Sequence, residues 1–177
     1  IKATLIQGSK KMLVLKINDV KNFMNQLLIG QTFDDFSLVD ASITTFCSFM
    51  IDGTLHRDFF DSDSKQPSVQ SALYCPWKEL KSYCYSIIRG KLPPLHFRIT
   101  FQLNSSQLTQ ILPAFSDVIT DPAIRGLNLN LQYKNHELFC TSGISSDGFL
   151  LDKSPEFIWD SFITDYFRSR QINFDRL

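Results

Sequence analysis

Two runs of alternating apolar and polar residues constrain the fold of this chain more than any other feature. Every second residue is apolar in residues 97–103, and the same alternation runs through residues 127–134. Successive side chains of a strand point to opposite faces, so this alternation is typical of antiparallel strands with one buried and one solvated face. The sequence therefore predicts a sheet with an open polar face.

Four other segments space their apolar residues as amphipathic helices do, namely residues 20–28, 77–88, 108–115 and 158–167. Asn18 and Ser154 are suited to cap the first and the last of these helices. Pro113 lies inside the third segment, which makes that helix short or kinked. We therefore predict an α+β fold in which an antiparallel sheet is combined with about four helices.

The predicted elements follow the order strand, helix, strands, helix twice along the chain. The remaining strands are predicted at residues 13–17, 36–43, 45–51 and 138–144, with a less certain one from Thr54. Asp52-Gly53, Asn135-His136 and Asp147-Gly148 are predicted turns. We interpret this order as an internal duplication with pseudo-repeats at about residues 12–91 and 95–170. The alternative is coincidence, because such patterns recur in α+β proteins.

Length and charge limit the organisation of the chain. The 177 residues suit one domain, which we place at residues 12–177. Residues 1–11 carry Lys2, Lys10 and Lys11 ahead of Met12, and we interpret them as an upstream extension or an expression remnant. The formal net charge of +0 depends on those three lysines. The rest is mildly acidic, which argues against strong non-specific nucleic-acid binding.

The four cysteines predict free thiols. Cys47, Cys75, Cys84 and Cys140 are far apart and show neither a CxxC pair nor zinc-ligand spacing. No secretory leader and no membrane-length apolar run is present in the sequence. We therefore expect a cytoplasmic protein with reduced thiols and no membrane contact.

Candidate catalytic groups are few. Acidic residues gather in the first half, namely Asp34, Asp35, Asp40, Asp52, Asp58, Asp61 and Asp63. Several of them converging on Mg²⁺ would favour a metal-dependent hydrolase, although turn formation and loop solvation explain most of them. Cys47 or Cys140 would need a histidine from a distant element to act as a nucleophile. No glycine-rich phosphate loop is present. We predict no catalytic residue, metal or cofactor.

The polar side of the second-half strands is the predicted binding face. If the two strands are neighbours in the sheet, one face carries Arg98, Thr100, Gln102, Asn128, Asn130 and Gln132. Amide and guanidinium groups on one face can form hydrogen bonds with bases, sugars or a protein partner. The alternative is an ordinary solvated face of an antiparallel sheet.

Three functions are compatible with these features. The absence of a catalytic constellation, the charge balance and the 16 phenylalanines favour a non-catalytic binding or accessory module that recognises a protein partner or self-associates through an exposed apolar patch. The alternative is a nucleic-acid-associated module that uses the polar face, with Arg98 and Lys134 in a positive stripe. The third is a metal-dependent hydrolase that uses the acidic cluster.

Several short segments carry a family resemblance. They are Leu15-Lys-Ile-Asn-Asp-Val-Lys-Asn-Phe-Met24, Phe33-Asp-Asp-Phe36, Ala41-Ser-Ile-Thr-Thr-Phe46, Ile51-Asp-Gly53 and Trp77-Lys-Glu-Leu80. With them, the chain from Met12 onward resembles an uncharacterised bacterial family found mainly in Clostridia-like Firmicutes. This resemblance implies no activity. The order of elements is also similar to that of duplicated TATA-binding-protein-like folds, and more loosely to sliding-clamp folds, which is a likeness of topology only.

Overall fold

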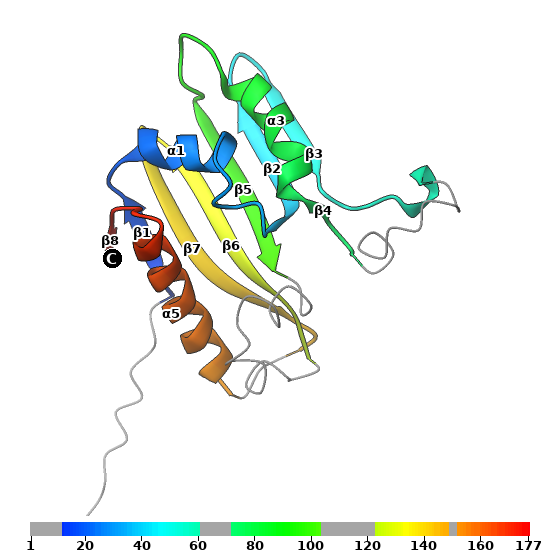
Figure 1. The fold of residues 1–177 in the computed structure, drawn as a ribbon, viewed down its shortest axis with the longest axis vertical. Coiled ribbons are helices and arrows are strands. Elements are labelled where there is room, and N and C mark those ends of the chain that lie inside the picture. The colour runs from blue at the N-terminus through cyan, green and yellow to red at the C-terminus, as the bar shows by residue number, and fades with distance from the viewer. Residues whose placement is uncertain (1–11, 61–71, 104–122, 149–151) are drawn as a thin grey trace, which may run out of the picture.

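One antiparallel sheet forms the body of the protein. The computed structural model describes residues 12–60, 72–103, 123–148 and 152–177. The strands are β1 (Val14–Ile17), β2 (Ser37–Thr44), β3 (Ser48–Asp52), β4 (Cys75–Pro76), β5 (His96–Leu103), β6 (Ile124–Lys134), β7 (Glu137–Ser146) and β8 (Phe174–Arg176). The helices are α1 (Val20–Leu28), α3 (Trp77–Ile88) and α5 (Ser154–Ser169), with a short 3-10 helix η1 (Arg57–Phe59). All three α-helices lie on one face of the sheet (Figure 1).

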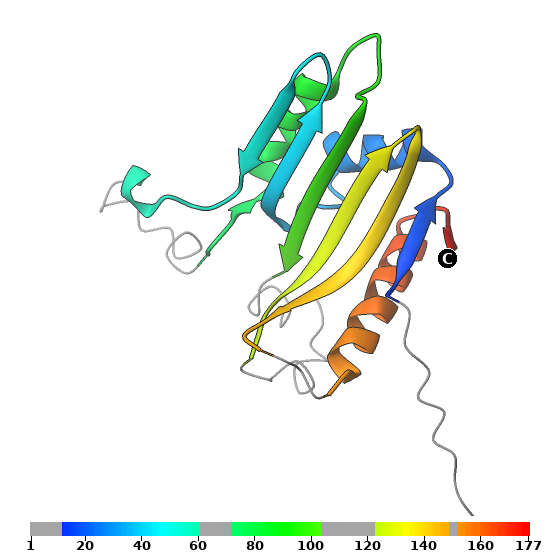
Figure 2. The ribbon, with the colours of Figure 1, turned by 180° about the vertical axis from the view of Figure 1, so that it is seen from behind.

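The strand order along the sheet is β3-β2-β5-β6-β7-β1-β8. β4 also pairs with β2, at the part of β2 that β3 does not reach. Every named strand pair is antiparallel. Seen from behind, the other face of the sheet carries no helix of the described residues (Figure 2). The predicted α+β class and the predicted one-sided antiparallel sheet are therefore confirmed.

The predicted duplication is not confirmed by the strand order. β5 lies next to β6 of its own half, whereas β1 pairs with β7 of the other half and with the terminal strand β8. Corresponding strands of the two halves therefore occupy non-equivalent places in the sheet. Three α-helices fall in the described residues, and the fourth predicted helix, at residues 108–115, lies outside them.

Helix ends differ slightly from their predicted positions. Asp19, and not Asn18, caps α1, because its carboxylate accepts a hydrogen bond of 2.9 Å from the Asn22 N–H. Lys153 is the N-cap residue of α5, while the Asp152 carboxylate accepts from the N–H and hydroxyl of Ser154. The capping that we assigned to Asn18 is therefore done by Asp19, and Ser154 is the first residue of α5 and not its cap.

The turn predictions had mixed outcomes. Asn135 and His136 form the β6–β7 hairpin turn as predicted, with φ values of 53° and 64°. Asp52-Gly53 was wrongly predicted to be a hairpin turn, because Gly53 stays beside β2 and donates its N–H to the Val39 carbonyl at 2.9 Å. The strand predicted from Thr54 is only an isolated bridge to Tyr74.

Aromatic rings fill the core between the sheet and the helices. Phe33 is central: its ring centroid lies 5.3 Å from Phe23, 5.9 Å from Phe101 and 6.3 Å from Phe167. These four side chains are fully buried. Phenylalanine has no polar group to satisfy, so the rings pack here without a hydrogen-bonding requirement.

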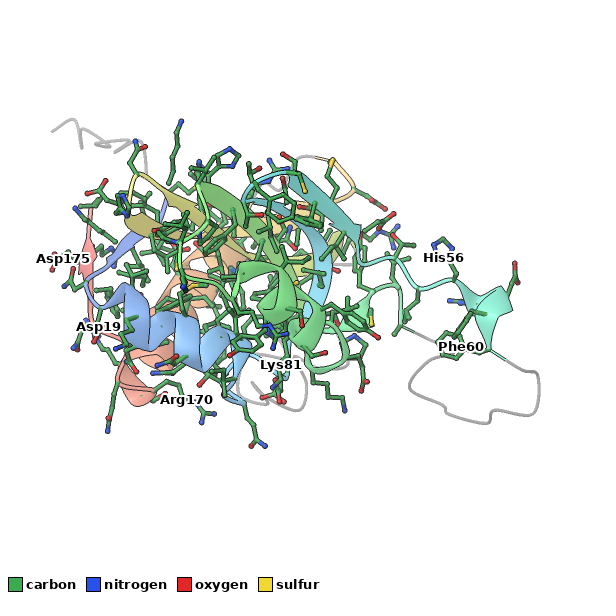
Figure 3. The ribbon with its side chains drawn as sticks, turned by 90° about the horizontal axis from the view of Figure 1, so that it is seen from above. Asp19, His56, Phe60, Lys81, Arg170 and Asp175 are labelled. Carbon is green, nitrogen blue, oxygen red and sulfur yellow. The ribbon has the colours of Figure 1, made fainter. Side chains whose placement is uncertain are left out.

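Polar contacts fix α3 beside α1. The Lys81 ammonium lies between these helices (Figure 3) and donates to the Gly30 carbonyl at 2.7 Å and to the Asp34 carboxylate at 2.6 Å. Gly30 follows Ile29, the C-cap residue of α1. The end of α1, the following turn and α3 are therefore held together as one unit over one part of the sheet.

Candidate functional site

The six residues of the predicted binding face lie together on the open face of the sheet. In the β5–β6 register, Arg98 is opposite Gln132, Thr100 is opposite Asn130, and Gln102 is opposite Asn128. The prediction that they share one face is confirmed, whereas their role in binding stays a prediction.

Three of these six side chains make hydrogen bonds within the protein, and one of them is Thr100, whose hydroxyl donates to the Asp40 carboxylate at 3.4 Å. Gln102 donates to the Asn128 side-chain oxygen at 3.0 Å, and the Asn128 amide donates to the Ser145 hydroxyl at 2.6 Å. The Gln102 side chain lies against Gly126, where a Cβ would come within 2.3 Å of it, and Gln102 is buried. This end of the face is therefore a structural amide network, and Arg98, Thr100, Asn130 and Gln132 remain more accessible.

Two positive charges on the open face, Arg98 and Lys16, have acidic neighbours. Arg98 lies 4.0 Å from the Asp40 carboxylate, and Lys16 lies 2.6 Å from Glu137. The hydrogen bond to Glu137 raises the pKa of Lys16. The positive stripe expected for nucleic-acid binding is interrupted by carboxylates, which screen the attraction to phosphates.

The acidic residues of the first half that the structure describes do not converge on one point. Asp34 pairs with Lys81, and Asp52 accepts hydrogen bonds from the Thr54 N–H and hydroxyl, which lower the pKa of Asp52. Asp61 and Asp63 lie outside the described residues. Among the residues that are described, no three His, Cys, Asp or Glu side chains are grouped so that they could hold a metal ion.

The four cysteines are free thiols. Cys84 and Cys140 are buried in the core, Cys75 is half-buried, and Cys47 is exposed in the β2–β3 turn. Burial raises the pKa of Cys140 well above its ordinary value and that of Cys84 to about 11. Both buried thiols are therefore neutral near pH 7, which opposes a role as nucleophile.

Burial of Cys84 predicts a loss of stability in alkali. The unfolded thiol ionises near pH 9 and the folded one near pH 11, so its stabilising effect is complete below pH 9 and decreases as the pH rises toward 11. Between pH 8 and pH 10.5 the free energy of unfolding is expected to fall by about 2 kcal/mol more in the wild type than in Cys84→Ala. Urea titrations of both proteins at the two pH values measure this difference, and parallel pH profiles would contradict it.

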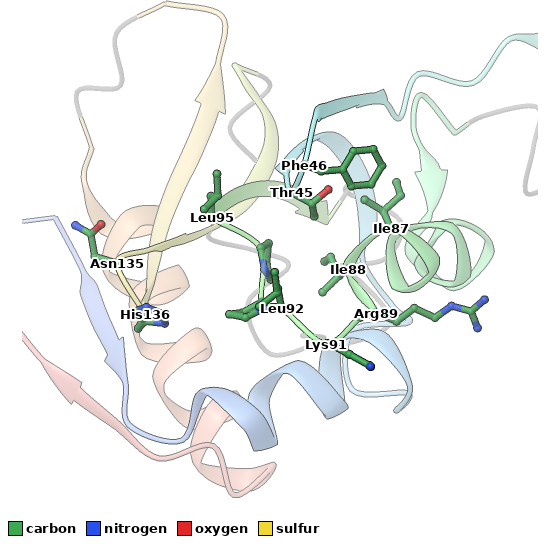
Figure 4. Close-up of a pocket in the computed structure, with 13 residues that line it drawn as sticks. Thr45, Phe46, Ile87, Ile88, Arg89, Lys91, Leu92, Leu95, Asn135 and His136 are labelled. Atoms are coloured by element: carbon green, nitrogen blue, oxygen red, sulfur yellow. The ribbon is translucent and has the colours of Figure 1, made fainter.

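A large cavity opens at one end of the sheet. Its volume is about 820 Å³, and four segments enclose it (Figure 4): the turn after β2, the last turn of α3, the loop of residues 89–95 and the β6–β7 turn. The residues that line it are mainly apolar, with Phe46, Ile87, Ile88, Leu92, Pro93, Pro94 and Leu95 among them. A cavity of this size and composition is typical of binding sites.

Three apolar side chains stand exposed at this cavity. Phe46 is 93 % exposed, Leu92 83 % and Leu95 67 %. We call the cavity together with these three side chains the apolar end. Sequence reasoning missed it because the residues come from turns and loops. The only signal in the sequence was the presence of large apolar residues inside predicted connections.

The loop of residues 89–95 forms the wall of the apolar end for a local reason. Arg89 leaves the helical conformation with φ −61° and ψ 129°, and Pro93-Pro94 prevents the helix from continuing. The Leu95 N–H then donates to the Thr44 carbonyl at 2.9 Å, which aligns the chain with β2. A second cavity of about 400 Å³ lies along the same loop, between α1 and α3.

The charged residues that line both cavities are basic. Arg89 and Lys91 line the larger cavity, and Lys21 and Arg89 line the smaller one. In Figure 4 the Arg89 guanidinium points away from the larger cavity, so its aliphatic stem forms the wall. No carboxylate is among the lining residues of either cavity. The lysine and arginine side chains that line the two cavities are therefore not accompanied by a lining carboxylate.

His136 at the apolar end has a strained backbone. Its φ of 64° is uncommon for a residue with a side chain, and glycine is preferred at the second position of such a hairpin turn. The Tyr133 hydroxyl lies 3.5 Å from His136 Nδ1. Strained residues are often found at functional sites, so this turn supports the apolar end as a candidate site.

The fold and the site define a class of protein: an α+β domain with a one-sided antiparallel sheet and an apolar cavity at one end. The chain belongs to a family of unknown function (DUF5721), whose model matches residues 26–175. No curated protein and no solved structure matches it. The likeness to TATA-binding-protein-like and sliding-clamp folds and the bacterial origin stay predictions. None of the helices in the described residues is long and apolar enough to span a membrane.

Proposed function

We propose that this protein is a non-catalytic binding module that recognises a protein partner through the apolar end. The observation that carries the proposal is the exposure of Phe46, Leu92 and Leu95 around one cavity. Contiguous exposed apolar groups rimmed by polar residues are typical of protein interaction sites. A partner that inserts an apolar anchor into the cavity would cover these side chains and bring them out of water.

The charge around the cavity supports a partner of a particular kind. Arg89, Lys91 and Lys21 line the two cavities without an acidic neighbour among the lining residues. An apolar anchor flanked by carboxylates complements this surface, because opposite charges speed association and exclude basic competitors. All four cysteines are free thiols, which supports a reducing compartment such as the cytoplasm as the place of action.

The alternatives have less support. Nucleic-acid binding through the open face would require a positive surface, but Arg98 and Lys16 have acidic neighbours there. A metal-dependent hydrolase would require converging carboxylates, and the described acidic residues are separately engaged or apart. The apolar end is therefore the best-supported of the three candidate functional sites.

A site-specific capture experiment tests the proposal. A photo-crosslinking amino acid at Leu92, introduced in the cells that make the protein, is expected to capture a partner that the same amino acid at Phe59 does not capture. Phe59 is a matched control, because it is 84 % exposed on η1, which projects away from the body (Figure 1). The captured protein is then purified and its affinity for the wild type measured by calorimetry.

Two equivalent substitutions complete the test. Phe46→Ser is expected to weaken binding of the captured partner by about tenfold or more, because a central aromatic anchor contact is lost. Phe59→Ser removes an equally exposed ring and is expected to leave the affinity unchanged. Equal capture at Leu92 and Phe59, or equal affinities of the two variants, would contradict the proposal.

A further inference from the structure

β3 is an edge strand of the sheet that the described residues form. Among the described residues its only strand neighbour is β2. The strand has five residues, Ser48–Asp52, with no proline or lysine, and its central residue Met50 is 85 % exposed. Edges of this kind can accept a further strand, and proteins that avoid such pairing shorten or charge their edges.

The opposite edge shows that protection. β8 has three residues, Phe174–Arg176, and its exposed members Asp175 and Arg176 are both charged. Short length and charge both disfavour added strands. The two edges of one sheet therefore differ, and only β3 has the properties of a pairing edge.

The β2–β3 register shows which backbone groups of β3 point outward. Asp40 of β2 lies opposite Asp52 of β3, and the Gly53 N–H, one residue further along, donates to the Val39 carbonyl. Asp40 and Asp52 therefore form a non-hydrogen-bonded pair of the antiparallel ladder. Alternation along an antiparallel ladder then directs the N–H and C=O groups of Ser48, Met50 and Asp52 away from β2. The backbone N–H and C=O groups of Phe49 and Ile51 point toward β2 and form the hydrogen bonds between the two strands.

We propose that β3 pairs antiparallel with β3 of a second copy of this chain, about a two-fold axis at Met50. Met50 then lies opposite Met50 of the second copy, and Ser48 lies opposite Asp52 of the second copy. In this register the outward N–H and C=O groups of each copy face the outward C=O and N–H groups of the other copy. They form about six backbone hydrogen bonds between the two copies. The two sheets become one continuous sheet.

The side chains of β3 are compatible with this register. Phe49 and Ile51 are half-buried on the helix-covered face, opposite the buried Ile43 and Ala41 of β2. In the dimer Phe49 lies opposite Ile51 of the second copy, so the apolar edge of the core is closed on both sides. Met50 lies on the open face against its own counterpart.

Charge complementarity favours a second copy as the occupant. The only charged residue of β3 is Asp52, and the antiparallel register places it opposite a serine and not opposite another carboxylate. Ser48 follows the turn that carries Thr45 and Phe46, which line the cavity together with Arg89 and Lys91. Asp52 of the second copy therefore approaches the end of β3 beside this cavity, whose lining includes Arg89 and Lys91 and no carboxylate. The formal net charge of +0 brings no overall repulsion.

Sedimentation velocity on the full chain at 1–100 µM tests this inference. The wild type is expected to dimerise in this range, whereas Met50→Pro is expected to raise the dimer dissociation constant at least about 100-fold. Proline at Met50 removes an outward N–H and leaves the bonds to β2 in place, a position that edge strands tolerate. Met50→Lys keeps the backbone but places a charge on the axis, and it is expected to weaken the dimer to the same degree.

Controls separate this inference from the proposed function, on which it does not depend. Asp175→Lys at the β8 edge and Leu92→Ser at the apolar end are expected to dimerise as the wild type does. Met50→Lys is expected to bind the partner captured at Leu92 with unchanged intrinsic affinity. A wild type that stays monomeric at 100 µM, or a Met50→Lys protein that dimerises normally, overturns the inference, even if Met50→Pro fails to fold.

Discussion

Replacing Trp77 with alanine is expected to lower the free energy of unfolding by about 3–5 kcal/mol. Trp77 is fully buried at the start of α3, and its ring centroid lies 4.9 Å from that of Phe101. Its indole N–H donates to the Leu27 carbonyl at 2.9 Å. The substitution removes a large apolar side chain from the core and leaves a cavity. It also leaves the carbonyl at the end of α1 without its hydrogen-bond donor.

Urea unfolding followed by tryptophan fluorescence measures this loss. The chain has two tryptophans, so Trp159 still reports unfolding in the variant. Trp77→Phe is the control: it keeps most of the ring contact and loses the hydrogen bond, and a smaller loss of about 1–3 kcal/mol is expected. A loss below about 1 kcal/mol for Trp77→Ala would show that α3 is not held to α1 and the sheet as described.

Gly53→Ala is expected to destabilise the protein by about 3 kcal/mol. A Cβ at Gly53 would lie 1.8 Å from the Leu38 carbonyl oxygen and 2.6 Å from its carbon. Both atoms belong to the backbone of β2, so neither can move aside without disturbing the β2–β5 pairing. Overpacking against backbone is not relieved by a change of rotamer.

Gly90→Ala is the matched control for this substitution. A Cβ at Gly90 would meet only the Leu92 carbonyl at 3.8 Å, an ordinary contact distance. The change in stability is therefore expected to lie within about 1 kcal/mol of zero. Thermal and urea denaturation of both variants test the contrast. Similar stabilities of the two proteins would contradict the close approach of Gly53 to β2.

The glycine at position 53 also shows how far local sequence reasoning extends. Asp52-Gly53 has the composition of a hairpin turn, and the turn was predicted on that basis. The structure uses the missing side chain for close approach to β2 instead. Asn135-His136 has weaker turn composition and forms the hairpin turn, because the two strands on either side pair with each other.

Of the two candidate sites, the polar face could be predicted from the sequence in part, and the apolar end could not. The alternation in residues 97–103 and 127–134 placed Arg98 and Thr100 on one side of their strand and Asn130 on one side of its own, because side-chain direction in a strand is set by the backbone. The pairing of β5 with β6 in the tertiary structure then brings the three residues onto one face. The apolar end was not predictable. Phe46, Leu92 and His136 are distant in the sequence and belong to three connections, and no periodicity relates them.

The sequence by itself determined the type of most elements, the open polar face and the apolar stripes of the helices. These follow from the two side-chain periods of 2 and 3.6 residues, which are local properties of the backbone. Only the tertiary structure decided that β1 pairs with β7, that β3 is an edge strand of the described sheet, and that four segments meet around the apolar end. Strand neighbours are chosen by long-range burial and backbone pairing, and the same local patterns are compatible with several such choices.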